Sequence, residues 1–101
     1  MQTKTSVKID FVQTKKSIAI LKALNHKLRL QMLKLIDESQ KITVTEIYVK
    51  LRIEQSVASQ HLAMLRRANI VTTKRDGKYI YYAVNYNRIE EITKFVKDLV
   101  D

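Results

Sequence analysis

Polar and basic side chains between residues 54 and 68 have the types and spacing needed to contact DNA. If this segment is a helix, Ala58, Leu62 and Leu65 recur at helical spacing and form a buried stripe. The opposite, outer side is small and polar at its start and basic at its end, and it consists of Ser56, Ser59, Gln60, Ala63 and Arg67. The segment is therefore a candidate recognition helix.

Short hydroxyl and amide groups can approach base edges in the DNA major groove, while arginines reach the phosphates. An ordinary amphipathic helix with a modest polar face would look similar, and this segment alone fits both interpretations. The rest of the chain distinguishes them.

The chain has 101 residues, which predicts a single domain over residues 1–101. It contains no cysteine, which excludes disulfides, thiolate metal sites and thiol redox switches. We find neither a signal peptide nor an apolar run of the ~18–20 residues that span a bilayer. We therefore expect a cytoplasmic protein that needs no cofactor and no membrane.

The net charge of +9 is unevenly distributed. Residues 1–40 and residues 41–85 each carry 8 basic and 3 acidic groups, whereas residues 86–101 carry 3 basic and 4 acidic groups. A basic surplus is typical of nucleic-acid binders, because neutralising phosphates releases condensed counterions. The distribution indicates that the last segment faces away from the polyanion, although a basic protein without such a partner would also carry this charge.

Helices are predicted around the candidate recognition helix. Apolar periodicity predicts them over residues 7–24 and 25–38, and residues 1–6 are expected to be frayed. Thr43 and Glu46 have the spacing of a capping box, with Ile42 and Ile47 at the staple positions, which predicts a short helix over residues 44–51. Because only residues 52–54 separate this helix from the next, the pair forms a helix-turn-helix pattern.

After Asn69, a plausible left-handed C-cap, the apolar period changes from helical to two. Residues 70–74 and 78–84 are rich in β-branched and aromatic side chains, and Asp76-Gly77 between them predicts a hairpin with a two-residue type I′ turn. The tip would carry Lys74, Arg75 and Lys78, which can lie along a phosphate backbone or can protect an exposed sheet edge. We favour the phosphate interpretation.

The last segment, residues 87–101, opens with Asn87 as an expected N-cap and carries an apolar stripe. Such a helix can dock on its own core or pair with a second subunit, and a chain this short favours some use in dimerisation. We expect residues 7–24 and 87–101 to be the dimerisation helices. The predicted fold is mainly α with a small β-hairpin, a winged helix-turn-helix.

Three segments in this order resemble the ArsR-type family of bacterial repressors. Residues 24–33 are similar to its L-x-x-x-x-R-L-x-I-L run, and residues 56–71 to its S-x-x-S-x-H-L-x-x-L-x-x-A-G-L-V run. Residues 75–82 are similar to its R-x-G-(x)-YY wing. The resemblance covers about residues 18–100 and implies a DNA-binding winged helix-turn-helix.

Departures from the family pattern concern both docking and sensing. Asn69 and Arg52 replace glycines, and Glu54 stands where a Ser or Thr cap is common. The segment corresponding to the family's third helix has no thiol, the last helix has no histidine, and His26 alone cannot bind a metal. Many members of this family sense metals through such groups, but the resemblance does not imply metal sensing for this chain. Whether a small-molecule effector exists is left open.

We interpret the chain as a homodimeric, sequence-specific repressor of a palindromic double-stranded DNA operator, without catalytic or metal-binding residues. Base edges would be read by Gln55, Ser56, Ser59 and Gln60. Phosphates would be contacted by Arg66, Arg67, Lys74, Arg75 and Lys78, with Thr43 and Thr45 adding contacts at the supporting helix. The alternatives are a winged helix that docks on another protein and a nonspecific nucleic-acid-binding architectural protein.

Overall fold

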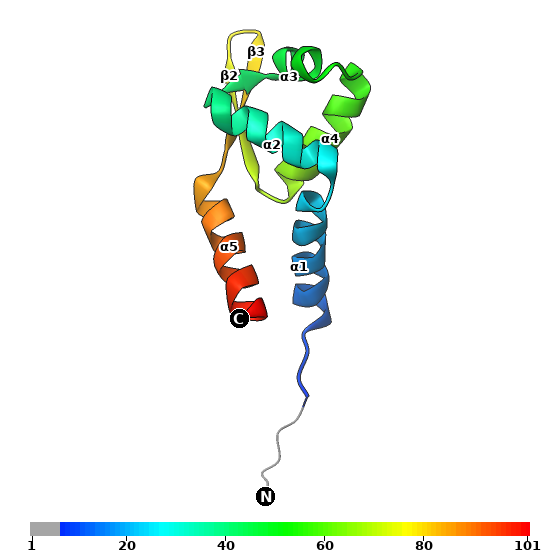
Figure 1. Cartoon of the computed structure of the whole chain (residues 1–101), viewed down its shortest axis with the longest axis vertical. Coiled ribbons are helices and arrows are strands. Elements are labelled where there is room, and N and C mark those ends of the chain that lie inside the picture. Colours follow the sequence, from blue (N-terminus) through cyan, green and yellow to red (C-terminus); the bar gives the residue numbers. More distant parts are fainter. Residues whose placement is uncertain (1–6) are drawn as a thin grey trace, which may run out of the picture.

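The computed structural model describes residues 7–101, so the expected fraying of residues 1–6 lies outside the described residues. The elements follow the order α1 (Phe11–Leu24), α2 (Lys27–Ser39), β1 (Ile42–Thr43), α3 (Val44–Leu51), α4 (Gln55–Arg67), β2 (Val71–Asp76), β3 (Tyr79–Val84) and α5 (Tyr86–Val100). This order of helices and hairpin confirms the predicted winged helix-turn-helix (Figure 1).

Side-chain caps place the first two helices later in the chain than periodicity predicted. The start expected at residue 7 is wrong, because Asp10 is the N-cap of α1 and its carboxylate accepts from the backbone N–H of Gln13 at 3.1 Å. Likewise, α2 begins at Lys27 rather than at residue 25. Its N-cap is His26, whose Nδ1 accepts from the backbone N–H of Leu28 at 3.1 Å.

The predicted N-cap of the last helix is also wrong by two residues. Asn85, not Asn87, caps α5, and its side-chain oxygen accepts from the backbone N–H of Arg88 at 3.3 Å. The amide nitrogen of Asn85 also donates to the carbonyl oxygen of Asn69 at 3.0 Å. This contact across the hairpin favours capping at residue 85, and it involves a partner far away in the sequence.

The sheet contains a strand that the sequence pattern did not reveal. β1 pairs with β3 in an antiparallel register that sets Ile42 against Tyr82, and the strand order is β1-β3-β2. Two residues are too few to show a period of two. The predicted capping box is confirmed, because Thr43 of β1 accepts from the backbone N–H of Glu46 while the Glu46 carboxylate accepts from that of Thr43.

The hairpin turn is shifted by one residue from the prediction. Asp76 pairs with Tyr79, so the two central turn residues are Gly77 and Lys78 rather than Asp76 and Gly77. Only the first of them, Gly77, has a positive φ, at 64°. Type I′ would require positive φ at both central residues, whereas a glycine at the first central position is the pattern of a type II′ turn.

Side chains from α2, β1, α3, α4 and β2 build the core. The largest fully buried residues are Met32, Ile36, Ile42, Ile47, Leu62, Leu65, Ile70 and Val71. Met32 and Ile36 come from the central helix α2, and Leu62 and Leu65 are on the stripe predicted for α4. The core therefore fixes which side of α4 faces outward.

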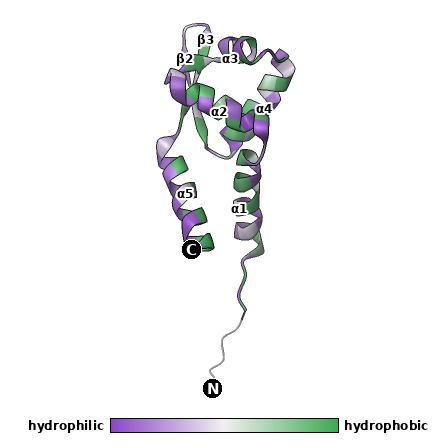
Figure 2. Cartoon of the chain, viewed as in Figure 1, coloured by the Kyte–Doolittle hydropathy of each residue, from purple (hydrophilic) through white to green (hydrophobic). Residues whose placement is uncertain are grey.

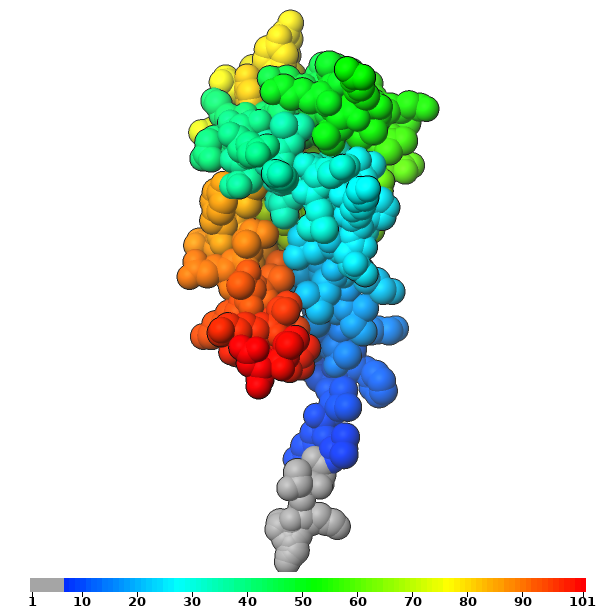
Figure 3. Space-filling model, viewed as in Figure 1, coloured from blue at the N-terminus to red at the C-terminus, as the bar shows by residue number. Residues whose placement is uncertain are grey.

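The helices α1 and α5 project in the same direction from the body formed by α2, α3, α4 and the sheet (Figure 1). Hydrophobic residues recur along both of them (Figure 2). At the opposite end, the tip of the hairpin stands out from the body (Figure 3). Within residues 7–101, the structure contains no helix with the length and apolar character of a membrane span.

Candidate nucleic-acid interface

The outer side of α4 is exposed as its sequence predicted. Ala58, Leu62 and Leu65 are fully buried, and this fixes the rotation of the helix. The polar and basic residues of the other side are all exposed, namely Gln55, Ser56, Ser59, Gln60, Arg66 and Arg67. They form one continuous polar face along the helix, which we call the α4 outer face.

A tight turn holds α3 against the start of α4. Arg52 takes a left-handed backbone conformation with φ 56°, and the N–H of the next residue, Ile53, donates to the carbonyl oxygen of Tyr48 at 3.1 Å. A left-handed residue is where glycine is preferred, so the structure gives a physical reason for the glycine common at this position in the family pattern. Glu54 is the N-cap of α4 without a side-chain capping bond.

A buried arginine attaches α4 to the end of α1, and sequence reasoning missed it. The Arg29 side chain donates from Nε to the carbonyl oxygen of Ala23 at 2.7 Å and from Nη2 to that of Lys22 at 3.0 Å. Its Nη1 lies 3.0 Å from Nδ1 of His61 and 3.2 Å from the sulfur of Met64, both on α4. Arg29 thus satisfies carbonyls in the last turn of α1 and positions α4.

His61 is the part of α4 that faces this arginine. Burial, then the nearby His26 and Arg29, lower the pKa of His61 below its ordinary 6.5. The two imidazole centroids are 4.8 Å apart. Because a guanidinium only donates hydrogen bonds, Nδ1 of His61 accepts and Nε2 carries the ring proton. The neutral ring is a packing and hydrogen-bonding group, as the sequence pattern indicated.

The α4 outer face continues onto the wing through a shared hollow. A depression of about 410 Å³ is lined by Ser59, Ala63, Arg66 and Arg67 of α4 together with Tyr82 of β3. The structure therefore brings one predicted base-reading residue, Ser59, and two predicted phosphate-binding residues, Arg66 and Arg67, to one open surface.

The strand register separates the predicted basic residues of the wing. Arg75 pairs with Ile80, on the face of the sheet that also carries Tyr82 and leads to α4. Lys74 pairs with Tyr81 on the other face. Lys78 lies in the turn with its ammonium 5.4 Å from the Tyr79 ring centroid. The three cations all lie near the tip, but they do not form one cluster.

Lys41 is a basic residue of the wing that sequence reasoning missed. Its ammonium lies 4.8 Å from the centroid of the Tyr81 ring, and it lines a small hollow together with Lys74. Lys41 comes directly before β1, the strand too short to be predicted. The chain offers no local signal that would have placed it beside the hairpin.

Two predicted threonines have different surroundings. Thr43 is 8% exposed, and its hydroxyl is used in the capping box with Glu46. These hydrogen bonds from the backbone and the hydroxyl of Thr43 lower the pKa of Glu46. Thr45, in the first turn of α3, is exposed. Thr43 thus stabilises the supporting helix, and only Thr45 is open to a phosphate.

Among residues 7–101, no three His, Cys, Asp or Glu side chains come together as a metal site requires. The surface of α4 and the wing instead combines exposed hydroxyls, amides and cations, which suits a polyanion with readable edges.

Comparison with known families agrees with this geometry. The family model described as "Bacterial regulatory protein, arsR family" matches residues 26–73, which include α2, α3, α4 and the start of the wing. The chain is also 30% identical over 84 residues to the transcriptional activator HlyU of Vibrio cholerae, covering 83% of this chain and 77% of HlyU.

The solved structures point the same way. The transcriptional repressor PagR of Bacillus anthracis superposes with a TM-score of 0.68 at 29% identity, covering 86% of this chain and 99% of PagR. A homodimeric winged helix-turn-helix DNA-binding domain of Mycobacterium bovis shares the fold, with a TM-score of 0.74 at 22% identity over 93% of this chain and 91% of that one.

Proposed function

The chain belongs to the ArsR family of bacterial regulatory proteins, and from this premise we propose that it is a dimeric repressor that reads its operator with the α4 outer face. As a member of this family it is a DNA-binding transcriptional regulator. The observation that carries the proposal is the exposed polar side of α4, which continues through the hollow at Ser59 and Arg66 onto the wing.

Base reading is assigned to Gln55, Ser56, Ser59 and Gln60. The buried stripe of α4 fixes the rotation that turns these side chains outward, so they need little rearrangement to enter a major groove. An amide such as that of Gln60 can make two hydrogen bonds to an adenine edge, while serine hydroxyls contact several bases. Gln60 is therefore the residue from which we expect the strongest discrimination.

Phosphate binding is assigned to exposed groups around that face. Arg66 and Arg67 end α4 on the side of the hollow, and Arg75 stands on the wing face leading to it. The remaining groups are Thr45, Lys74 and Lys78, joined by Lys41 beside Tyr81. These contacts hold the protein in register and contribute the salt-dependent part of the affinity.

Dimerisation is assigned to the projecting parts of α1 and α5. In α5, Ile89 and Ile92 pack on the core, whereas the following turns leave the body. Both helices expose large apolar side chains, namely Phe11, Val12 and Ile18 on α1, and Phe95, Val96, Leu99 and Val100 on α5. Apolar surface of this extent is uncommon on monomers and favours a second copy as its cover.

A two-fold dimer presents two copies of α4, so the operator would be palindromic with half-sites about one helical turn apart. The chain has no thiol to gate this binding. PagR is a repressor and HlyU an activator, so the family alone does not fix the sign of regulation. We assign repression because an operator-bound dimer can occlude a promoter.

Fluorescence anisotropy tests the proposal directly. The protein is titrated against DNA from its own upstream promoter and against a scrambled duplex, each at two salt concentrations. Tighter binding to the promoter that persists at the higher salt supports sequence-specific regulation. Equal and salt-sensitive binding would indicate an architectural role, and binding to neither duplex would favour protein docking.

A further inference from the structure

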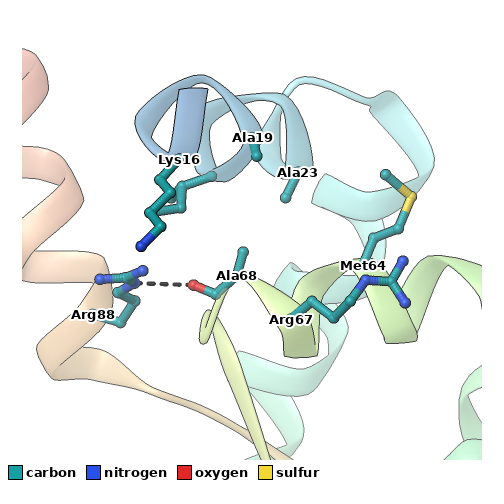
Figure 4. Close-up of a pocket in the computed structure, with 8 residues that line it drawn as sticks. Lys16, Ala19, Ala23, Met64, Arg67, Ala68 and Arg88 are labelled. Atoms are coloured by element: carbon teal, nitrogen blue, oxygen red, sulfur yellow. Dashed lines mark hydrogen bonds between the residues drawn. The ribbon is translucent and has the colours of Figure 1, made fainter. Parts of the chain in front are cut away.

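A third hollow lies where α1, the end of α4 and the start of α5 meet, and Arg67 is the residue that it shares with the α4 outer face. It has a volume of about 490 Å³, and its lining residues are Lys16, Ala19, Ile20, Ala23, Met64, Arg67, Ala68 and Arg88 (Figure 4). This volume is within the range of about 300–1,000 Å³ that holds small molecules. None of the residues assigned to base reading lines this hollow.

The walls of this hollow are largely apolar. Three alanines, Ala19, Ala23 and Ala68, leave room beside the longer Ile20 and Met64. Two of the alanines, Ala23 and Ala68, are buried, so the hollow reaches to the base of the helices. Small side chains on the wall make space for the apolar body of a ligand.

One end of the hollow is cationic. The ammonium of Lys16 and the guanidinium of Arg88 lie at the same end, and Arg67 extends at the other (Figure 4). Arg88 is fixed there because its Nε donates to the carbonyl oxygen of Ala68 at 2.9 Å. Its Nη1 is 3.5 Å from the carboxylate of the exposed Glu91.

Glu91 pairs with Arg88 from outside the lining, so this end keeps the positive charge of Lys16. The lining contains no Asp or Glu, and the ion pairs found within residues 7–101 do not involve Lys16. Two cations that converge beside an apolar wall are complementary to a single anion with an apolar body.

We propose that this hollow binds a small organic carboxylate, with its charge between Lys16 and Arg88 and its apolar body against the alanines and Met64. Met64 lies in the last turn of α4 and Ala68 directly follows the helix, so a bound ligand contacts the helix that we assign to base reading. The site would therefore couple ligand binding to DNA binding, and this coupling, unlike the site itself, rests on the proposed function.

Octanoate is a suitable probe, with octanamide as its uncharged match. Backbone amide chemical shifts of the ¹⁵N-labelled protein should change saturably at Ala19, Ala23 and Ala68 when octanoate is added. Octanamide should bind more weakly. Lys16→Gln should weaken octanoate binding about tenfold, because one charge-assisted contact is lost. Lys15→Gln, an exposed neighbour outside the hollow, should bind like the unaltered protein.

The anisotropy assay then measures coupling. Saturating octanoate should change promoter affinity by about fivefold or more, and Lys16→Gln should abolish that change while leaving ligand-free DNA binding intact.

Equal binding of octanoate and octanamide, equal effects of the two lysine variants, or no saturable shifts would overturn the site. Binding of octanoate without any change in DNA affinity would overturn the coupling. Absence of DNA binding in the ligand-free protein would reject the proposed function, while the chemical shifts would still decide the site.

Discussion

Arg29 of α2 donates from Nη1 to Nδ1 of His61 on α4 across 3.0 Å, while its Nε is bonded to the last turn of α1. One buried guanidinium therefore joins three helices, including the one assigned to DNA reading and one assigned to dimerisation. This contact is a physical connection between those two assigned surfaces.

Replacing Arg29 should destabilise the fold strongly. Arg29→Met leaves the buried carbonyl of Ala23 without its donor and leaves that of Lys22 with only the backbone N–H of Asn25, and we expect the free energy of unfolding to fall by about 2–4 kcal/mol. Urea denaturation at a fixed protein concentration measures this loss. Lys27→Met, an exposed residue of the same helix, is the matched control and should change stability little. Similar losses in both variants would contradict the assigned role.

Stability should depend on pH through His61. Its pKa is lowered in the folded protein by burial and then by His26 and Arg29, so the unfolded chain takes up a proton first as pH falls. Stability should therefore be fully present above 6.5, the ordinary pKa, and decline as pH falls toward the lower folded value.

Melting temperatures measured at about pH 7.5 and about pH 5.5 test this dependence. The melting temperature of the unaltered protein should fall more between the two pH values than that of His61→Gln, in which an amide oxygen can still accept from Arg29. Glu46 does not interfere, because its lowered pKa places its titration below 4.5. An unchanged pH dependence in His61→Gln would exclude His61 as its source.

Glu54→Ser should improve both stability and DNA binding. Glu54 caps α4 without a side-chain hydrogen bond, and its charge stands at the end of the helix expected to enter the groove. A serine supplies the missing cap, worth about 0.5–1 kcal/mol, and removes repulsion of phosphate. Affinity should rise alike for promoter and scrambled DNA in the anisotropy assay. Weaker binding by Glu54→Ser would mean that the carboxylate makes a favourable contact.

The proposed dimer interface can be tested with one charge. Leu99 is 70% exposed at the projecting end of α5, and Leu99→Lys should shift the protein toward monomers in sedimentation velocity. Val49, which is 61% exposed on α3 outside the projecting helices, provides the control Val49→Lys and should leave the dimer intact. A protein that is monomeric before substitution, or a dimer unaffected by Leu99→Lys, would contradict this interface.

The sequence predicted correctly the features that are determined by residues close together in the chain. The spacing of Ala58, Leu62 and Leu65 oriented α4, and Thr43 with Glu46 marked the start of α3. These features depend on residues within a few positions of each other, so the chain displays them directly.

Tertiary contacts decided what the sequence could not reveal. Asn85 rather than Asn87 caps α5, and only Asn85 bonds to the distant Asn69. The burial of Arg29 depends on carbonyls and an imidazole that three helices bring together. The position of Lys41 beside Tyr81 likewise depends on a strand of two residues.

The measurement that tests the central claim most directly is the ratio of scrambled to promoter Kd for Gln60→Ala and Arg75→Ala. Gln60→Ala should lower that ratio about fivefold or more, because a base-edge contact is lost. Arg75→Ala should weaken both duplexes alike, preserve the ratio and reduce the salt slope by about 1. If the two variants change both duplexes equally, the α4 outer face does not read sequence and the account is wrong.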